Sequence, residues 1–399
     1  MRKTIKLFVA ILAVCLAFSL GVQSMSINQS IPNTALCMAQ KPTQGLISYG
    51  DEAVVAVSTN SAPQILPFLK RLFGKNTTKP QTEQKLEPQK FVYVGGKPLG
   101  FTINSKGVVV VGVCEVETQN GKVCTITEGE ILPGDVLVAL NDTEIVGAKS
   151  IAEFLRNTYT GGGAKAKLLR DEKFVFATIY PAKDELTNEY KLGLWIRDNS
   201  AGVGTLTYVE EDGSFGALGH AVCDLDTGSA IPVSKGNVYR CNVIGVEKSK
   251  AGKPGELRGL FIKNSSQLGS IDKNTTNGVF GKIENKDFIS SLGQKVAVAQ
   301  KGELKMGKAT LITTISGTTP KEYDIEIIKT SYTNQSKQHC FVVRISDPVL
   351  LENTGGIVQG MSGSPILQEG KLVGAITHVF VNDASKGFAL HIDQMLNEK

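Results

Sequence analysis

The sequence has few of the residues on which several classes of protein depend. Its 399 residues include one tryptophan, four histidines and seven cysteines, and no two cysteines are spaced as Cys-x-x-Cys. This scarcity gives no support to a structural zinc site with the usual ligand spacing. The formal charge is only +5 and the basic residues form no cluster, which argues against a strong nucleic-acid binder.

Composition excludes three further classes. The chain is 41% hydrophobic and 20% charged, as in ordinary globular proteins, so it is not a disordered chain, a coiled coil or a polytopic membrane protein. Its length exceeds what one hydrophobic core organises, and two or three domains are expected. Its 42 glycines and many short Val/Ile runs predict a mostly β fold with many turns.

The N-terminal residues have the pattern of an export segment. Arg2, Lys3 and Lys6 precede an apolar run over residues 7–22, and polar residues follow. A retained anchor is also open, because tilt or thinning lets a bilayer accept a run shorter than about 20 residues. We assign residues 1–30 to a signal peptide or membrane anchor and expect the protein outside the cytoplasm.

Residues 31–90 are predicted to be an N-terminal segment and linker. Over residues 74–90 the sequence is polar and contains Pro80 and Pro88, and no apolar periodicity survives. An exposed linker of this kind is a natural site of proteolytic nicking.

The cysteines fit an exported protein only loosely. Without Cys15 they number six, an even count with no dense disulfide framework. His220 with Cys223, and His339 beside Cys340, are the alternative as zinc ligands, but adjacent His-Cys is poor chelating geometry. We therefore predict no metal and no cofactor.

Residues 91–185 show a compact, alternating pattern that predicts one domain. Leu99-Gly100-Phe101 leads into a turn and an apolar strand, and Gly134-Asp135 opens another strand. A helix over residues 150–159 and two closing strands complete the pattern. This order resembles a PDZ domain of the type found in exported proteases.

The PDZ resemblance implies binding of an extended peptide as an added strand. Backbone amides at Leu99, Gly100 and Phe101 would capture a peptide C-terminus or an internal segment, and the helix over residues 150–159 would form the other wall of the groove. The alternative is a packed β module with a blocked groove.

Residues 186–399 are predicted to be a second domain. Many short strands are separated there by Gly, Asn, Asp and Ser, and helical periodicity is scarce before the end of the chain. Regularly spaced short strands over about 200 residues indicate a sandwich or a pair of barrels.

One loop has the pattern of a hydrolytic serine. In Gly360-Met361-Ser362-Gly363-Ser364-Pro365 the glycines allow a tight turn, and the N–H groups of Gly360 and Ser362 could stabilise an oxyanion. A strand hairpin follows instead of a helix, which favours a double β-barrel peptidase over an α/β-hydrolase. The alternative is a surface turn without chemistry. Ser364 is a weaker candidate nucleophile because it precedes Pro365.

A serine needs a base, and the base needs an orienting group. Of the four histidines, His339 and His391 are interpreted as structural. His220 lies in a glycine-bounded turn far upstream of Ser362, and His378 lies 16 residues after it.

The residue pattern alone does not decide which side chain is the base and which is the acid. His220 and His378 are both candidates for the base. Asp224, Asp226 and Asp347 are the candidates for the acid, and spacing does not choose among them.

Three motifs together resemble the SpoIVB (stage IV sporulation protein B) peptidases. They are the Gly219-His220-Ala221 turn with its flanks, the loop from Gly360 to Pro365, and Thr377-His378-Val379 with the residues after it. The resemblance runs from about residue 91 to the end. It implies a trypsin-like double β-barrel with His220 as base, Ser362 as nucleophile and Asp347 as acid. The short Asp-to-Ser spacing departs from the trypsin arrangement.

The resemblance also implies a role in sporulation signalling. Such peptidases are exported into the space between the forespore membranes, cleave themselves and cut a membrane-associated regulator, which leads to activation of a late sigma factor. We expect protein substrates, peptide ligands and self-association, and no nucleic acid. Self-cleavage is predicted in the linker over residues 74–90. A non-catalytic PDZ-containing scaffold and a zinc hydrolase are the alternatives.

Overall fold

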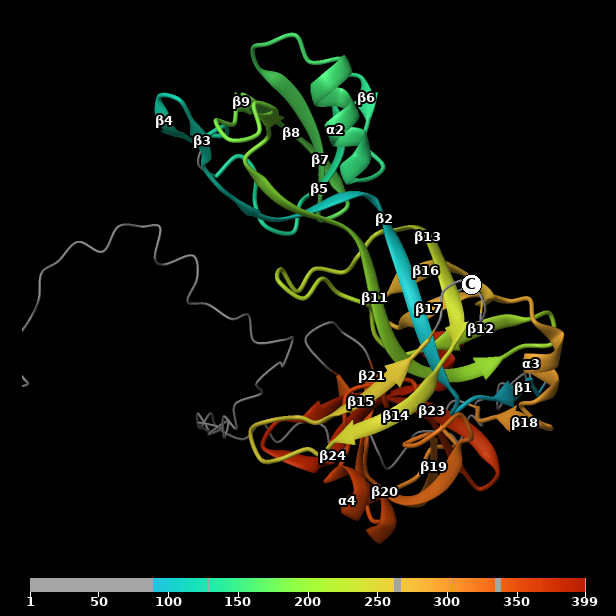
Figure 1. The fold of residues 1–399 in the computed structure, drawn as a ribbon. Coiled ribbons are helices and arrows are strands. Elements are labelled where there is room, and N and C mark those ends of the chain that lie inside the picture. Colours follow the sequence, from blue (N-terminus) through green and yellow to red (C-terminus); the bar gives the residue numbers. More distant parts are fainter. Residues whose placement is uncertain (1–88, 128, 262–266, 301, 334–338, 399) are drawn as a thin grey trace, which may run out of the picture. The chain divides into compact units, whose positions relative to one another are not determined.

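The computed structural model describes residues 89–398 except 128, 262–266, 301 and 334–338 (Figure 1). The predicted export segment (1–30) and almost all of the predicted linker and self-cleavage region lie outside the described residues. No helix in the described part of the chain is long and apolar enough to cross a membrane.

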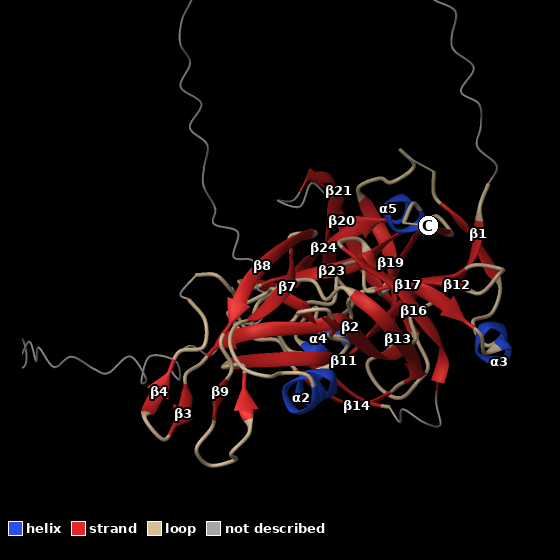
Figure 2. Ribbon diagram, turned by 90° about the horizontal axis from the view of Figure 1, so that it is seen from above, coloured by secondary structure: helices blue, strands red, loops and turns tan. Residues whose placement is uncertain are grey.

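Strands dominate the described residues, and helices are few and short (Figure 2). In chain order the elements are β1 (Phe91–Val94), β2 (Pro98–Val113), β3 (Val116–Thr118), β4 (Gly121–Val123), β5 (Val136–Leu140), β6 (Thr143–Glu144), α2 (Ala148–Asn157), β7 (Ala164–Arg170), β8 (Lys173–Ile179), β9 (Ala182–Lys183), β10 (Tyr190–Lys191), β11 (Leu194–Val209), β12 (Ser214–Ala217), β13 (Val233–Arg240), β14 (Asn242–Glu247), β15 (Glu256–Leu260), β16 (Gln267–Thr275), β17 (Gly278–Ile283), α3 (Lys286–Ser290), β18 (Lys295–Val298), β19 (Gly307–Thr313), β20 (Lys321–Thr333), β21 (His339–Ile345), α4 (Pro348–Thr354), β22 (Pro365–Gln368), β23 (Lys371–Phe380), β24 (Asp383–His391) and α5 (Ile392–Leu396).

The first barrel is a closed ring of antiparallel strands. β2 pairs with β11, and the ring continues through β12, β17, β16 and β13 back to β2. Alternate residues of these strands point inward, as period-2 strands require, and Leu99, Phe101, Leu206 and Phe215 are among the buried core residues.

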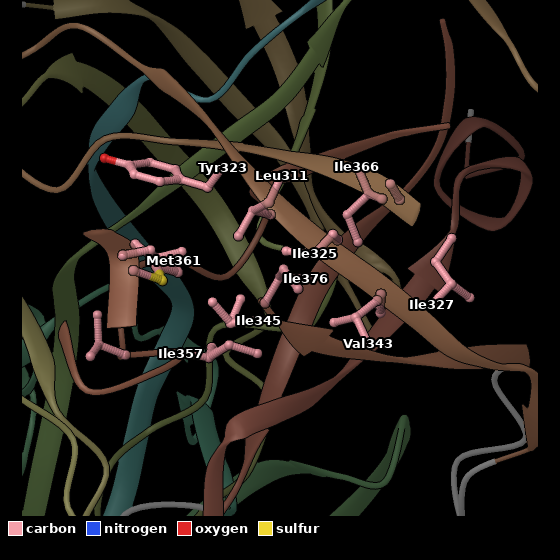
Figure 3. Close-up of a cluster of buried hydrophobic side chains, with 14 of the residues drawn as sticks. Leu311, Tyr323, Ile325, Ile327, Val343, Ile345, Ile357, Met361, Ile366 and Ile376 are labelled. Carbon is pink, nitrogen blue, oxygen red and sulfur yellow. The ribbon is translucent and has the colours of Figure 1, made fainter. Parts of the chain in front are cut away.

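The second barrel closes in the same way. β19 pairs with β20, and the ring runs through β21, β24, β23 and β22 back to β19. Figure 3 shows its core, in which Leu311, Ile325, Val343 and Ile366 pack together. The predicted mostly β fold with two barrels is confirmed.

The segment from Val108 to Ile196, here called the small domain, has its own core. Val108, Leu137, Phe154 and Leu168 are buried together, and Leu194 packs against them. The predicted helix is α2. Strands β2 and β11 belong to both the small domain and the first barrel, because their paired ladder continues from one into the other with shifts of register.

The structure places the predicted peptide-binding loop inside the first barrel. Leu99, Gly100 and Phe101 lie inside β2, paired with β11 on one side and β13 on the other. Leu99 and Phe101 are 0% and 2% exposed in the core of the first barrel. Their backbone amides and side chains are therefore not available to bind a peptide.

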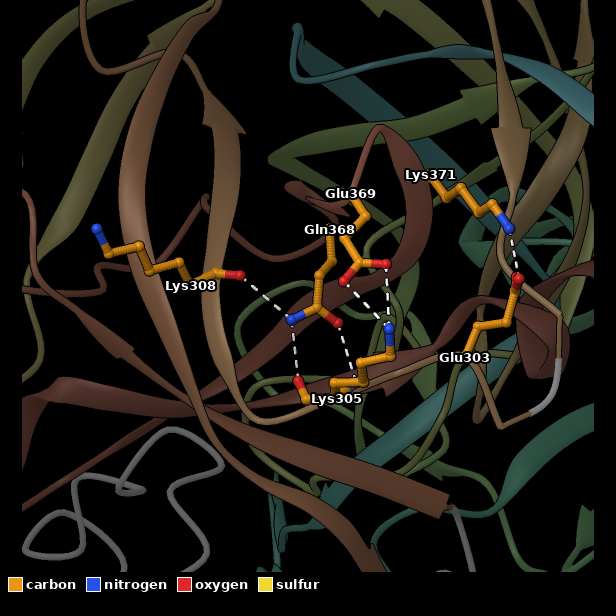
Figure 4. Close-up of polar contacts among 6 residues, drawn as sticks. All are labelled: Glu303, Lys305, Lys308, Gln368, Glu369 and Lys371. Carbon is orange, nitrogen blue, oxygen red and sulfur yellow. Dashed lines mark hydrogen bonds and ion pairs between the residues drawn. The ribbon is translucent and has the colours of Figure 1, made fainter.

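Polar contacts fix the hairpin of β22 and β23 that follows the predicted serine loop (Figure 4). The Gln368 amide donates to the carbonyls of Lys305 and Lys308, and its oxygen accepts from the Lys305 N–H. Lys305 and Lys371 form ion pairs with Glu369 and Glu303. The hairpin turn therefore has a defined position beside β19.

Candidate active site

The serine loop joins α4 to β22 and is anchored in the second barrel. Met361 is 0% exposed and points into the core shown in Figure 3. Gly360 and Gly363 have φ values of +94° and +91°, which favour glycine. A Cβ atom at Gly363 would lie 2.1 Å from the carbonyl oxygen of Thr205, so glycine is required there.

A strand of the first barrel holds this loop from the other side. The Thr205 N–H donates to the Ser362 carbonyl (3.0 Å), and the Thr205 hydroxyl donates to the Gly360 carbonyl (2.7 Å). The Thr207 hydroxyl donates to the Gly363 carbonyl (2.7 Å). The sequence analysis did not identify either threonine. The signal available was two threonines at alternate positions of an otherwise apolar strand.

The loop leaves two N–H groups without an acceptor among the described residues. The N–H groups of Met361, Gly363 and Ser364 donate to backbone carbonyls, whereas those of Gly360 and Ser362 donate to none. Available donors at these two positions are what an oxyanion hole needs.

The two serines of the loop have different surroundings. The Ser364 hydroxyl is fully buried and donates to the Thr313 hydroxyl (2.9 Å), so it is a structural group. The Ser362 hydroxyl is only partly buried and donates to the carbonyl of Thr377 (2.8 Å), on β23. Ser362 is therefore the accessible hydroxyl.

The turn that carries His220 packs directly on the serine loop. Leu218 and Gly219 both have positive φ, and the position of a Cβ atom at Gly363 lies only 2.4 Å from the Leu218 nitrogen. The His220 Nδ1 lies 2.8 Å from the Ala221 carbonyl oxygen. A proton on Nδ1 satisfies this carbonyl and leaves Nε2 as an acceptor, which is the tautomer that a general base needs.

His378 lies beside His220. The ring centroids are 4.9 Å apart with an interplanar angle of 36°. Burial lowers the pKa of His220, and burial together with the charge of His220 lowers the pKa of His378 to about 3. Both rings are therefore neutral at pH 7.

The three candidate acids do not contact His220. Asp347 caps α4 by accepting from the Leu350 N–H (2.8 Å), and Asp224 and Asp226 bind Arg197. Within the described residues none of the three shares a hydrogen bond or ion pair with His220, so the expected Asp347–His220 contact is absent. The Ala221 carbonyl occupies that place.

Sequence reasoning also missed Asn274, on β16. Its side chain accepts from the Val222 N–H (2.7 Å) and donates to the carbonyls of Val222 (2.8 Å) and Ile231 (2.9 Å). It therefore closes the base of the loop that follows His220. A polar residue in a strand gave no signal for this role.

No group of three or more His, Cys, Asp or Glu side chains in the described part of the chain could hold a metal ion. The Cys223 thiol donates to the Ala221 carbonyl (3.8 Å).

Two closed barrels with a serine loop packed on a histidine turn are the architecture of a serine peptidase. The model of the family SpoIVB peptidase S55 matches residues 188–396, more than half of the chain. The chain belongs to this family and is a serine peptidase.

Solved structures of other proteases are similar over about half of the chain. The active form of the Rv3671c protease from M. tuberculosis is 15% identical over 50% of this chain and 74% of that one, with a TM-score of 0.29. The HtrA-type protease AlgW with a decapeptide is 14% identical over 53% of each chain, with a TM-score of 0.30. No curated protein sequence matches the chain.

Proposed function

We propose that Ser362 is the nucleophile and His220 the general base of an endopeptidase. Nε2 of His220 takes the hydroxyl proton as Oγ attacks the peptide carbonyl, and the N–H groups of Gly360 and Ser362 stabilise the oxyanion. His220 then gives the proton to the leaving amine. The observation that carries this proposal is the histidine turn packed on a loop whose two N–H groups are unused.

Attack requires one change from the observed geometry. The Ser362 hydroxyl donates to the Thr377 carbonyl, and it must leave this acceptor in order to donate to Nε2 of His220. The Ala221 carbonyl fixes the imidazole tautomer, and Asp347 caps α4 ahead of the serine loop.

The test compares the two serines of one loop. Ser362→Ala should lower turnover by about four orders of magnitude and abolish labelling by a fluorophosphonate probe, because the nucleophile is lost. Ser364→Ala is the control, because its buried hydroxyl serves only the fold. Ser362→Ala protein that cuts peptides at the wild-type rate would show that the nucleophile is misassigned. A folded wild-type chain that the probe does not label would support the scaffold alternative.

We also propose that the peptidase acts in sporulation signalling outside the cytoplasm, cleaving itself and a membrane-associated regulator. Membership of the SpoIVB family and the export pattern of residues 1–30 support this proposal. N-terminal sequencing of wild-type and Ser362→Ala protein from a sporulating host tests it. New N-termini within residues 74–90 should occur in the wild type and not in the variant.

One observation favours a second activity, peptide binding by the small domain. Over Leu194, Trp195 and Ile196, β11 pairs with β2 along one edge, and within the described residues its other edge pairs with no strand. Helix α2 lies near this part of β11, as its tie to Asp198 shows. A peptide could add here as a strand, in place of the predicted site at Leu99.

The single tryptophan offers a direct assay for this second activity. Trp195 is 64% exposed on the same stretch of β11, so its emission should change when a peptide binds. Titration of Ser362→Ala protein with peptides that have apolar C-termini is the measurement. Constant tryptophan emission and constant peptide anisotropy would indicate a packed β module with a blocked groove.

A further inference from the structure

Two of the aspartates considered as orienting acids have another partner. Arg197 donates through Nη1 to Asp224 (2.6 Å) and through Nη2 to Asp226 (2.5 Å). The Asp224 side chain is 1% exposed, whereas those of Arg197 and Asp226 are 35% and 39% exposed. One guanidinium thus bridges two carboxylates, and one of these is buried.

The bridged carboxylates stiffen the segment that follows His220. The second oxygen of Asp224 accepts from the N–H groups of Asp226 and Thr227, both at 3.0 Å. Asp224 is four residues after His220. Among the described residues the His220 ring forms one hydrogen bond, to its own neighbour Ala221, and packs on the His378 ring. Its position therefore depends strongly on the loop that carries it.

Arg197 lies where β11 passes from the small domain into the first barrel. Residues before it pair with β2 in the small domain, residues after it pair with β2 in the first barrel, and the register shifts between Arg197 and Asn199. The next residue, Asp198, accepts from the N–H of Ala148 at the start of α2 (3.0 Å). Consecutive residues of β11 therefore hold the His220 loop and the small domain's helix.

We propose that Arg197 is a positioning residue for the peptidase, which holds the His220 loop through Asp224 and Asp226. The inference rests on the proposed role of His220. A planar guanidinium satisfies two carboxylates at once, whereas an ammonium group reaches only one of them well. Without Arg197 the buried Asp224 carboxylate loses its only cation among the described residues, and the loop must shift to hydrate it.

The test is a set of arginine variants with a matched control. Arg197→Met should lower kcat by about 10- to 100-fold with little change in KM, because a base displaced by about 1 Å loses that much. The kcat of Arg197→Lys should lie between those of Arg197→Met and the wild type. Arg240→Met, on β13, is the control, because Arg240 contacts Asn285 and Phe288 and not the loop. It should keep wild-type kcat.

Two measurements separate positioning from folding. Asp226→Asn removes only the exposed arm of the bridge, so the protein should fold and lose up to about fivefold in kcat. The acidic limb of kcat/KM should also move toward higher pH in Arg197→Met, because a loosened loop hydrates His220. A variant that is only less stable would keep the acidic limb of kcat/KM at the wild-type pH.

The outcomes distinguish this inference from the function on which it rests. Wild-type kcat and an unmoved acidic limb in both Arg197→Met and Asp226→Asn would overturn the positioning role. If Ser362→Ala and His220→Ala kept wild-type activity, the proposed catalytic pair would be wrong whatever Arg197 does.

Discussion

Asn274 offers a quantitative test of how the histidine turn is held. Asn274→Ala removes three hydrogen bonds at 2.7, 2.8 and 2.9 Å, all to the backbone of the two segments that flank the loop. Each such bond contributes about 0.5–1.5 kcal/mol, and water can replace part of this at a half-buried site. We expect the free energy of unfolding to fall by about 2 kcal/mol.

Activity should fall further than stability predicts. Val222 is two residues after His220, so a freed loop displaces the base even where the protein is fully folded. A displacement of about 1 Å corresponds to a loss of up to about 100-fold in kcat/KM. Urea unfolding gives the stability. Cleavage of a fluorogenic peptide, measured at a temperature well below the unfolding transition, gives the activity.

A second asparagine serves as the control. Asn237, on the neighbouring strand β13, bonds the exposed Gln267 side chain and does not contact the loop. Asn237→Ala should leave kcat/KM unchanged. If Asn274→Ala also kept wild-type kcat/KM, the position of His220 would not depend on these hydrogen bonds, and the reasoning would fail.

Two further predictions concern pH and the core. Because the pKa values of His220 and His378 are lowered in the fold, protonation opposes folding: stability is full above about pH 6.5 and falls as the pH drops below it. The acidic limb of kcat/KM should likewise lie below pH 6.5, and a limb above it would contradict a buried base. Leu99→Ala should cost about 2–5 kcal/mol of stability by opening a cavity in the first barrel. Peptide affinity should not change. A selective loss of affinity in a stable Leu99→Ala protein would instead support the peptide-binding role predicted for Leu99, Gly100 and Phe101.

Much of the architecture was predictable from local pattern. Short apolar strands and glycine turns predicted a mostly β fold, either a sandwich or a pair of barrels, because strand periodicity and turn chemistry are local properties. The loop from Gly360 to Pro365 was predictable for the same reason. Its two positive-φ glycines and the following hairpin are encoded within a few residues.

The long strands were not predictable. The stretch around Lys106 and Gly107 has the pattern of a turn, yet β2 runs through it because β11 pairs with both halves. Leu99 and Phe101 fit a buried strand or a loop equally well until their partners on β11 and β13 are known. Pairing between segments about 100 residues apart leaves no local signal.

The helix cap formed by Asp347 had a local signal in the sequence. Asp347 before Pro348 is typical of a helix start, with aspartate as the cap and proline in the first turn. The family resemblance assigned it to His220. Asp224 and Asp226 form ion pairs with Arg197. Because Arg197 is distant from them in the sequence, the local pattern could not predict this partner.

The hydrogen bonds from Thr205 and Thr207 to the serine loop make the proposed reactive centre a joint product of early and late parts of the described chain. The second barrel closes only when β24 pairs with β21 and β23. A polypeptide still being synthesised therefore lacks the closed second barrel, against which the serine loop packs, until β24 (Asp383–His391) has emerged.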